Sequence, residues 1–341
     1  MCRVRGWGKN LPGRILGALP QRKWVKRLQR LGRELLVRLG RHVEDNSPAT
    51  RSRWPWTWVG DDSLFKKYGQ HLGLVGLGWS GQEPRVRLGI DGRLWLVVIG
   101  EGKLVVPVDC VVRRPDPVGP GSPCRDKLTW RRVMLDRTWA ALQRRCRRLP
   151  APLMVAESWC GETRLMAHVA NVQHGTLLVE GQCSDVFSRP DGRRVKGQDV
   201  WHGADWPWHD SAHVPGVRDA RLTAISPSDG RVTVVIVEQP GRDRYYLLCR
   251  ETTMVAPRLI RAWRRRSWIE HRFRTLKHLL ATEACQVLTE DAYDGHVILR
   301  LLAGLVLMYT ARVLCKGHIT MEELLFSWKH DWRFLDSECL E

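Results

Sequence analysis

Residues 261–277 read Arg-Ala-Trp-Arg-Arg-Arg-Ser-Trp-Ile-Glu-His-Arg-Phe-Arg-Thr-Leu-Lys, and this stretch decides how the rest of the chain is interpreted. Positions three, four and seven residues apart lie on one face of an α-helix. The spacing therefore predicts a helix with Trp263, Arg266, Glu270 and Lys277 on one face. Such a face suits a metal ligand brought to a phosphodiester that basic side chains hold. The basic residues around this single carboxylate are Arg258, Arg261, Arg264, Arg265, Arg266, Arg272, Arg274 and Lys277.

Two further carboxylate positions follow predicted strands. Asp61 and Asp62 come after the strand-like run 57–59, and Glu157 follows the apolar run 152–156. Successive residues of a strand face opposite ways, so only one of the two aspartates is expected to point into a given site. Open α/β sheets place their ligands at the carboxyl ends of strands, where Glu157 is expected. Taken alone, the two aspartates favour a turn, and Glu157 alone indicates only an ordinary carboxylate at a strand end.

The order of the predicted elements favours an α/β fold. The first half is predicted to contain strands at 57–59, 94–99 and 104–112, a helix at 129–147, a strand at 152–156 and a helix from residue 163. Strand-like runs between Gly and Pro turns then predict an all-β insertion, and these runs are 177–179, 221–224, 232–237 and 245–248. Beyond Pro257 the chain is predicted to be helical.

The composition points to a polyanionic partner. The 341 residues are 43% apolar, which is enough for a packed core, and they carry a net charge of +19. The ten cysteines form no Cys-x-x-Cys pair, which indicates reduced thiols and excludes a disulfide framework. The apolar run 301–311 is too short to cross a bilayer and predicts a buried helix. We expect a cytoplasmic, nucleoid-associated protein that has no membrane partner.

Taken together, these patterns resemble a DDE insertion-sequence transposase of the branch whose third acid lies in a Tyr-x2-Arg-x3-Glu-x6-Lys helix. The resemblance spans about residues 54–315 and is carried by Gly60–Leu64, Lys66–Gly69, Val155–Trp159, the helix at 263–277 and Gly295–Arg312. It implies a ribonuclease-H-like fold, in which a mixed sheet flanked by helices is interrupted by an all-β insertion before the last catalytic helix.

Four segments follow from this interpretation. They are a basic helical DNA-binding arm at 1–50, the first part of the catalytic domain at 51–175, the β-strand insertion at 176–250, and the last part of the catalytic domain with C-terminal helices at 251–341. Leu28, Leu31 and Leu35 recur at helical spacing among basic residues of the first segment. A helix packed on the main body explains that spacing as well as a DNA-contacting arm does.

The resemblance also implies an activity, which is cut-and-paste DNA transposition by phosphoryl transfer. Asp62, Glu157 and Glu270 are the implied ligands of two Mg²⁺ or Mn²⁺ ions, with Asp62 chosen because it directly precedes Ser63. The implied DNA-binding residues are Arg266 and Lys277 beside the scissile phosphate, with Trp263, Arg265, Arg272 and Arg274. The implied partner is double-stranded DNA, as transposon ends and target, bound by a homodimer in the synaptic complex.

The chain departs from the family pattern at three positions. Trp263 replaces Tyr, Ser63 replaces Thr, and Glu157 replaces the second Asp. A glutamate reaches one methylene further, and a metal pair about 4 Å apart tolerates little displacement. Two alternatives therefore stay open: a degenerate or domesticated copy that binds DNA without cutting it, and a metal-dependent nuclease without strand transfer.

Overall fold

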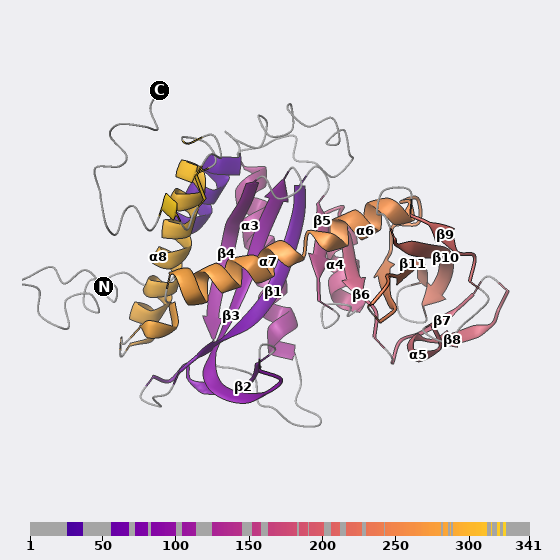
Figure 1. The fold of residues 1–341 in the computed structure, drawn as a ribbon, viewed down its shortest axis with the longest axis horizontal. Helices are drawn as coiled ribbons and strands as arrows, with labels where there is room; N and C mark the ends of the chain where they lie inside the picture. Colours follow the sequence, from indigo (N-terminus) through magenta and orange to yellow (C-terminus); the bar gives the residue numbers. More distant parts are fainter. Residues whose placement is uncertain are drawn as a thin grey trace, which may run out of the picture.

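The computed structural model describes residues 26–36 and, apart from short gaps, residues 56–324; the longest of these gaps is 114–124. The described chain is a mixed α/β structure in which a mixed sheet is flanked by helices (Figure 1). This arrangement is consistent with the fold class predicted from the sequence.

The first strand of the sheet along the chain is β1 (Trp56–Lys66). Strand β3 (Arg85–Ile99) pairs antiparallel with β1 along the whole of β1, through its residues 89–99. The other side of β3 pairs with β2 (Gly76–Ser80) and β4 (Leu104–Arg113), both antiparallel. The strands predicted at 94–99 and 104–112 therefore lie side by side as an antiparallel hairpin. Valine and leucine dominate the buried positions of β3 and β4, as expected for strands covered on both faces.

Two parallel strands extend the sheet from β1. Strand β5 (Leu153–Ala156) pairs with β1, and β6 (Thr176–Glu180) pairs with β5. The connecting helices are α3 (Arg125–Gln143) and α4 (Thr163–Val172). The parallel pairing of β6 places residues 176–180 in this part of the sheet, although the sequence assigned them to the insertion.

A lobe of short strands follows β6. Its elements are β7 (Val186–Ser188), β8 (Arg194–Lys196), α5 (Gly197–Val200), β9 (His209–Asp210), β10 (Arg218–Ser226), β11 (Gly230–Glu238) and β12 (Tyr245–Cys249). Strand β12 pairs with both β11 and β6, so the lobe continues the main sheet by hydrogen bonding. Two tryptophans of the lobe contribute to its interior. Trp206 is buried in its core, and Trp208 is packed against it.

The last part of the chain is helical. Its elements are α6 (Ala256–Arg264), α7 (Ser267–Arg274), a π-helical turn η3 (Thr275–Leu279), a short 3₁₀ turn η4 (Thr282–Ala284) and α8 (Glu290–Tyr309). By length and apolarity α8 could span a membrane, yet 61% of its most apolar window is buried inside the protein. Leu301 and Leu305 are fully buried, which confirms the helix predicted there to be a core helix.

Two helices cover opposite faces of β1. Trp58 contacts Trp139 of α3, whereas Phe65 contacts Phe273 of α7. Trp58 and Phe65 are seven positions apart, and an odd separation puts them on opposite faces of a strand. Figure 1 shows the same arrangement, with α7 in front of β1 and α3 behind it. We refer to these two sides as the α7 face and the α3 face.

The described part of the N-terminal segment is a helix at residues 26–36 that packs on the main body. Leu28 and Leu36 are fully buried in the main core. Gln29 donates to Asp109 Oδ2 at 3.1 Å, and Arg33 donates to the carbonyl of Ala141 at 2.9 Å. These contacts correspond to the first of the two interpretations considered, a helix docked on the body. The remainder of the predicted arm lies outside the described residues.

Candidate metal centre

The acids of β1 lie where its parallel partner ends. The pairing of β1 with β5 stops at Gly60 and Ala156, while β1 itself continues to Lys66. The two aspartates therefore sit in the middle of a strand, and the expectation that they end one is wrong. Beyond Gly60 none of the described strands pairs with this edge of β1, and Glu157 follows β5 directly beside it.

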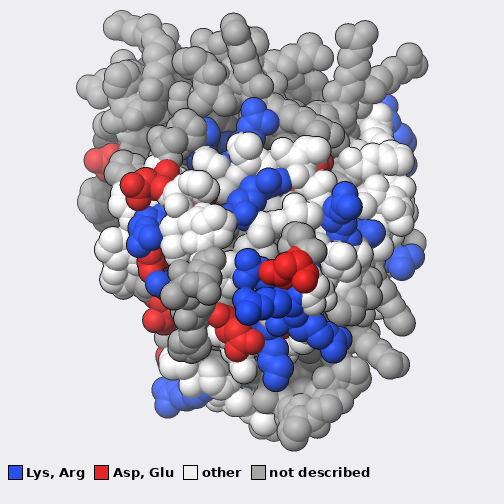
Figure 2. Space-filling view, turned by 90° about the vertical axis from the view of Figure 1, so that its right-hand side faces the viewer, with Lys and Arg blue, Asp and Glu red and all other residues white. Residues whose placement is uncertain are grey.

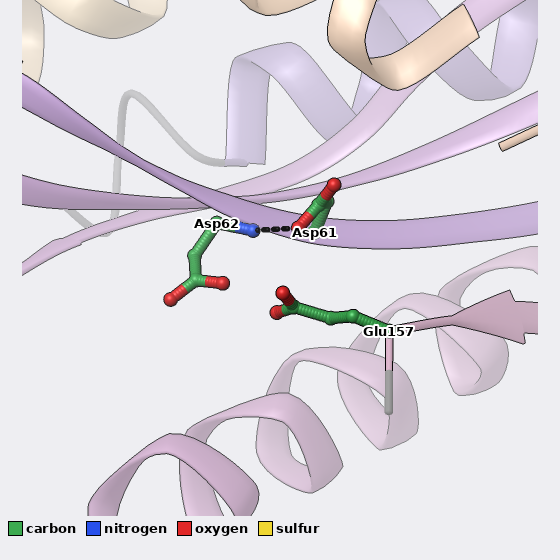
Figure 3. A group of neighbouring side chains, drawn as sticks. All are labelled: Asp61, Asp62 and Glu157. Carbon is green, nitrogen blue, oxygen red and sulfur yellow. Dashed lines mark hydrogen bonds between the residues drawn. The ribbon is translucent and has the colours of Figure 1, made fainter. Parts of the chain in front are cut away.

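Three carboxylates meet at this open edge. Asp61, Asp62 and Glu157 each offer an oxygen, and these atoms lie within 4.8 Å of one another. Figure 3 shows the carboxyl groups of Asp62 and Glu157 facing each other, with Asp61 on the other side of the strand. The backbone N–H of Asp62 donates to Asp61 Oδ1 at 2.8 Å. The alternation holds, but both aspartates still reach the group, because among the described residues no strand pairs with this edge of β1 beyond Gly60.

A buried arginine from α3 lies beside the same carboxylates. Arg131 Nη2 is 2.7 Å from Glu157 Oε1 and 3.4 Å from Asp62 Oδ1, and the Arg131 side chain is only 3% exposed. A Cβ at position 60 would lie 2.8 Å from Arg131 Nη1, so glycine there leaves room for the guanidinium. Sequence reasoning missed Arg131 because nothing in a helix rich in basic residues distinguishes it.

Glu270 is connected to these acids through another arginine. Arg266 Nη1 donates to Glu270 Oε1 at 3.1 Å, and Arg266 Nη2 donates to Asp61 Oδ2 at 3.2 Å. The Glu270 side chain is 57% exposed, and it does not belong to the group of three. The structure thus brings the predicted acids Asp62 and Glu157 together and adds Asp61 to them. Glu270 lies apart on the α7 face, where the Arg266 guanidinium bridges it to Asp61.

The predicted helical face does not continue over the whole of residues 263–277. Helix α6 ends at Arg264, and a tight turn precedes α7: Arg266 N–H donates to the carbonyl of Trp263, three residues back. After Arg274 the chain takes a π-helical turn, which has more residues per turn than an α-helix. Both changes alter the angle between successive side chains around the helix axis, so Trp263 and Lys277 no longer follow the spacing of one continuous α-helix. The pair Arg266 and Glu270 keeps its helical i,i+4 contact.

The predicted DNA-binding residues differ in how much of each is exposed to solvent: some lie at the surface and others are buried. Arg274 is exposed, and the Arg266 side chain is 24% exposed. Arg265 donates to Thr57 Oγ1 at 2.6 Å. Trp263 is half-buried, beneath the Arg266 guanidinium.

Two of these residues lie in the interior and do not match the predicted role. Lys277 is buried, with Nζ 5.9 Å from the centre of the Phe65 ring. Arg272 lies in the core and donates to the carbonyl of Val105 at 3.2 Å. Neither side chain is available at the surface for a DNA phosphate in this arrangement.

Burial and like charges make the acid group receptive to a cation. Burial raises the pKa of Glu157 well above its ordinary value, and the neighbouring Asp62 and Asp61 raise it further against the opposing effect of Arg131. Burial likewise raises the pKa of Asp61, although Arg266 opposes that shift. Carboxylate oxygens are the ligands that Mg²⁺ and Mn²⁺ prefer. The three side chains therefore fit a divalent ion in donor type and spacing.

The sequence matches no protein-family model and no curated protein. Among solved structures, the chain is similar to one in the cryo-EM structure of a piggyBac transposase synaptic complex with hairpin DNA. The two are 9% identical, and their TM-score is 0.43. The match covers 80% of this chain and 51% of that one, so this chain spans about half the length of that relative.

Proposed function

We propose that this chain is a DDE-type transposase with a ribonuclease-H-like catalytic domain, which cuts and joins double-stranded DNA. The observation that carries the proposal is the group Asp61, Asp62 and Glu157, with ligand oxygens within 4.8 Å of one another. Partly buried acids that raise one another's pKa are costly in a structural role, and such groups cluster at functional sites. The family resemblance of the sequence assigns the chemistry.

The metal ligands in this proposal are Asp61, Asp62 and Glu157. Divalent ions held there would activate the attacking hydroxyl and stabilise the leaving oxygen of the phosphodiester. Of these three acids Asp61 lies nearest α7, because its carboxylate accepts a hydrogen bond from Arg266, the residue directly before that helix. Arg131 fixes the longer side chain of Glu157 by donating to its carboxylate, which offsets the extra methylene relative to aspartate.

Glu270 stays in the proposal as the acid contributed by α7. Arg266 donates to both Glu270 and Asp61 and so holds the two carboxylates on either side of one guanidinium. An Arg266 side chain that turned to a DNA phosphate would release both acids, because guanidinium groups bind phosphate and carboxylate in the same bidentate way. Arg266 is thus proposed to couple DNA binding to the state of the acid group.

DNA binding is proposed to use exposed basic residues on two parts of the surface. Arg264 and Arg274 are exposed on α6 and α7. The lobe of short strands adds exposed basic residues, among them Arg193, Arg194, Lys196, Arg218 and Arg231. Figure 2, which views the molecule from the side of this lobe, shows basic side chains gathered with acidic ones beside them. We propose transposon ends and target DNA as the ligands, a homodimer as the working assembly, and the cytoplasm as the location.

The proposal is tested by cleavage and joining of a defined DNA. Purified full chain is incubated with Mg²⁺ and a duplex carrying the terminal repeats that flank its gene, and the products are separated on sequencing gels. A transposase releases 3′-hydroxyl ends at the repeat boundary and joins them to a second DNA. Cleavage without joining would identify a nuclease, and binding without any metal-dependent product would contradict catalysis.

A second candidate is a DNA-binding protein that does not cut. The observation that favours it is the presence of two guanidinium groups, Arg131 and Arg266, against three acids. These arginines offset two of the three negative charges and would compete with a divalent ion. The same cleavage assay separates this candidate from the transposase, because a non-cutting copy would bind the repeats in Mg²⁺ and in EDTA alike.

A further inference from the structure

An exposed apolar surface lies on the two-stranded extension formed by β2 and the first half of β3. Its residues Leu77, Trp79 and Val86 are 61%, 59% and 40% exposed. The register places Leu77 opposite Leu88 and Trp79 opposite Val86, so these four side chains share one face. We call this set the β2 surface. Large exposed apolar groups gathered on one face indicate an interaction site.

The edge next to the β2 surface is open for hydrogen bonding. In the described part of the sheet β2 is the terminal strand and pairs only with β3. Natural edge strands are usually protected against pairing by charged residues, proline or bulges. Strand β2 reads Gly-Leu-Gly-Trp-Ser and has none of these. It therefore offers a bare backbone edge directly beside exposed leucine and tryptophan.

The charged groups nearby do not favour a nucleic acid on this surface. Arg85 and Arg87 alternate with Val86 and Leu88 along β3, which puts them on the opposite face. Both arginines donate to Glu83, at 2.8 Å and 2.6 Å. The β2 surface itself is apolar, as expected for the core of a protein–protein contact.

We infer that the β2 surface pairs with the β2 surface of a second copy of this chain. The strand is self-complementary about Gly78: an antiparallel pairing centred there sets Leu77 against Trp79 of the second copy, and Trp79 against its Leu77. Gly76 then lies opposite Ser80 of the second copy, so every large side chain meets an apolar partner. Such a two-fold contact is closed and stops at a dimer. It deepens the homodimer of the proposed function by naming its surface.

The size of the strand sets the expected strength of the contact. Five residues bury less than the roughly 1,200–2,000 Å² typical of stable protein pairs. The association is therefore weak, with a dissociation constant on the order of micromolar or above. It depends on concentration when DNA is absent, and it would strengthen when two copies are held on one DNA.

Sedimentation velocity of the full chain, from about 1 to 100 μM, tests the contact without DNA or metal. Leu77→Glu and Trp79→Lys are each expected to weaken self-association at least tenfold. Ile225→Lys is the control, because Ile225 is also apolar and 54% exposed, but on β10. Circular dichroism of each variant checks that it is folded.

The double variant tests the register. Carrying both Leu77→Glu and Trp79→Lys, it should regain part of the association, because each glutamate then faces a lysine of the second copy. Single variants that are monomeric with no recovery in the double variant would overturn the pairing about Gly78.

A wild-type chain that stays monomeric at every concentration, or a dimer that both single variants retain, would overturn the contact itself. Single variants that sediment like the wild type but bind DNA more weakly would mean that the β2 surface binds DNA instead. None of these outcomes decides whether the chain cuts DNA.

Discussion

Arg131 and Glu157 form a partly buried pair, with Nη2 2.7 Å from Oε1, at the position where the proposed transposase pattern has a shorter aspartate. The guanidinium also lies 3.4 Å from Asp62, so one cation serves two of the three clustered acids. The longer side chain of Glu157 therefore ends at the guanidinium of Arg131, which holds its carboxylate in place. This pair decides how the acid group behaves with and without a divalent ion.

Replacing Arg131 should destabilise the metal-free protein and increase the effect of metal. Arg131→Gln leaves three crowded carboxylates without their nearest cation, and breaking a buried pair typically costs about 3–5 kcal/mol. We expect the Tm to fall in EDTA and saturating Mn²⁺ to raise it by more than in the wild type. Arg132→Gln is the matched control, since that neighbour on α3 is 62% exposed. An equal or smaller Mn²⁺ shift in Arg131→Gln would show that Arg131 does not share the site with a cation.

The raised pKa of Glu157 predicts a pH-dependent loss of stability. Its pKa in the folded protein lies above the ordinary 4.5, so the folded chain binds more protons than the unfolded chain in the pH range between these two pKa values. The stability from this group is complete below the ordinary pKa and is lost as the pH rises through the folded pKa. Glu157→Gln stays neutral, so it should lose less stability than the wild type between pH 5 and pH 8. Urea unfolding in EDTA measures the difference, and parallel curves for the two proteins would contradict the prediction.

Arg272 should be dispensable for stability and for DNA binding. It is buried among α7, β4 and α8, and among the described residues its Nη1 has no hydrogen-bond partner. Burial lowers its pKa to about 10, which reflects the cost of keeping this charge in the core. Arg272→Met should leave the free energy of unfolding unchanged or raise it by about 1–2 kcal/mol. Denaturant melts test this, and a large loss would show that the guanidinium is needed.

Arg274 should contribute one phosphate contact. It is exposed on the same helix as the buried Arg272. Each neutralised phosphate releases counterions, so Arg274→Ala should reduce the slope of log affinity against log salt by about one unit. Arg272→Met should leave the slope unchanged. Fluorescence anisotropy over a salt series makes the comparison, and equal slopes for all three proteins would remove α7 from the DNA-binding surface.

Much of the fold could be predicted because local patterns agree with the tertiary structure. The apolar run before Glu157 forms β5, and the hairpin formed by β3 and β4 follows from its apolar strands. The turn between α6 and α7 was not predictable, because three arginines and a serine contain no helix breaker. The continuation of β6 into the main sheet depends on pairing with β5, which is distant in sequence.

The site was predictable only in part for a similar reason. The carboxylates could be found from their positions relative to strands, and two of the three predicted acids do meet. The sequence does not reveal that the pairing of β5 with β1 stops at Gly60. Without that information it could not show that both Asp61 and Asp62 reach the group. Arg131 enters from α3 through packing against Gly60 and Trp95, which leaves no trace in local sequence spacing.

Mn²⁺ titration of the full chain, followed by electron paramagnetic resonance of the free ion, tests the central claim most directly. The claim is that Asp61, Asp62 and Glu157 form a divalent metal site. The wild type should bind Mn²⁺, Asp61→Asn and Glu157→Gln should each bind at least tenfold more weakly, and Asp136→Asn, a partly exposed acid on α3, should bind like the wild type. Wild-type binding that all three variants retain, or no binding by the wild type at all, would contradict the claim.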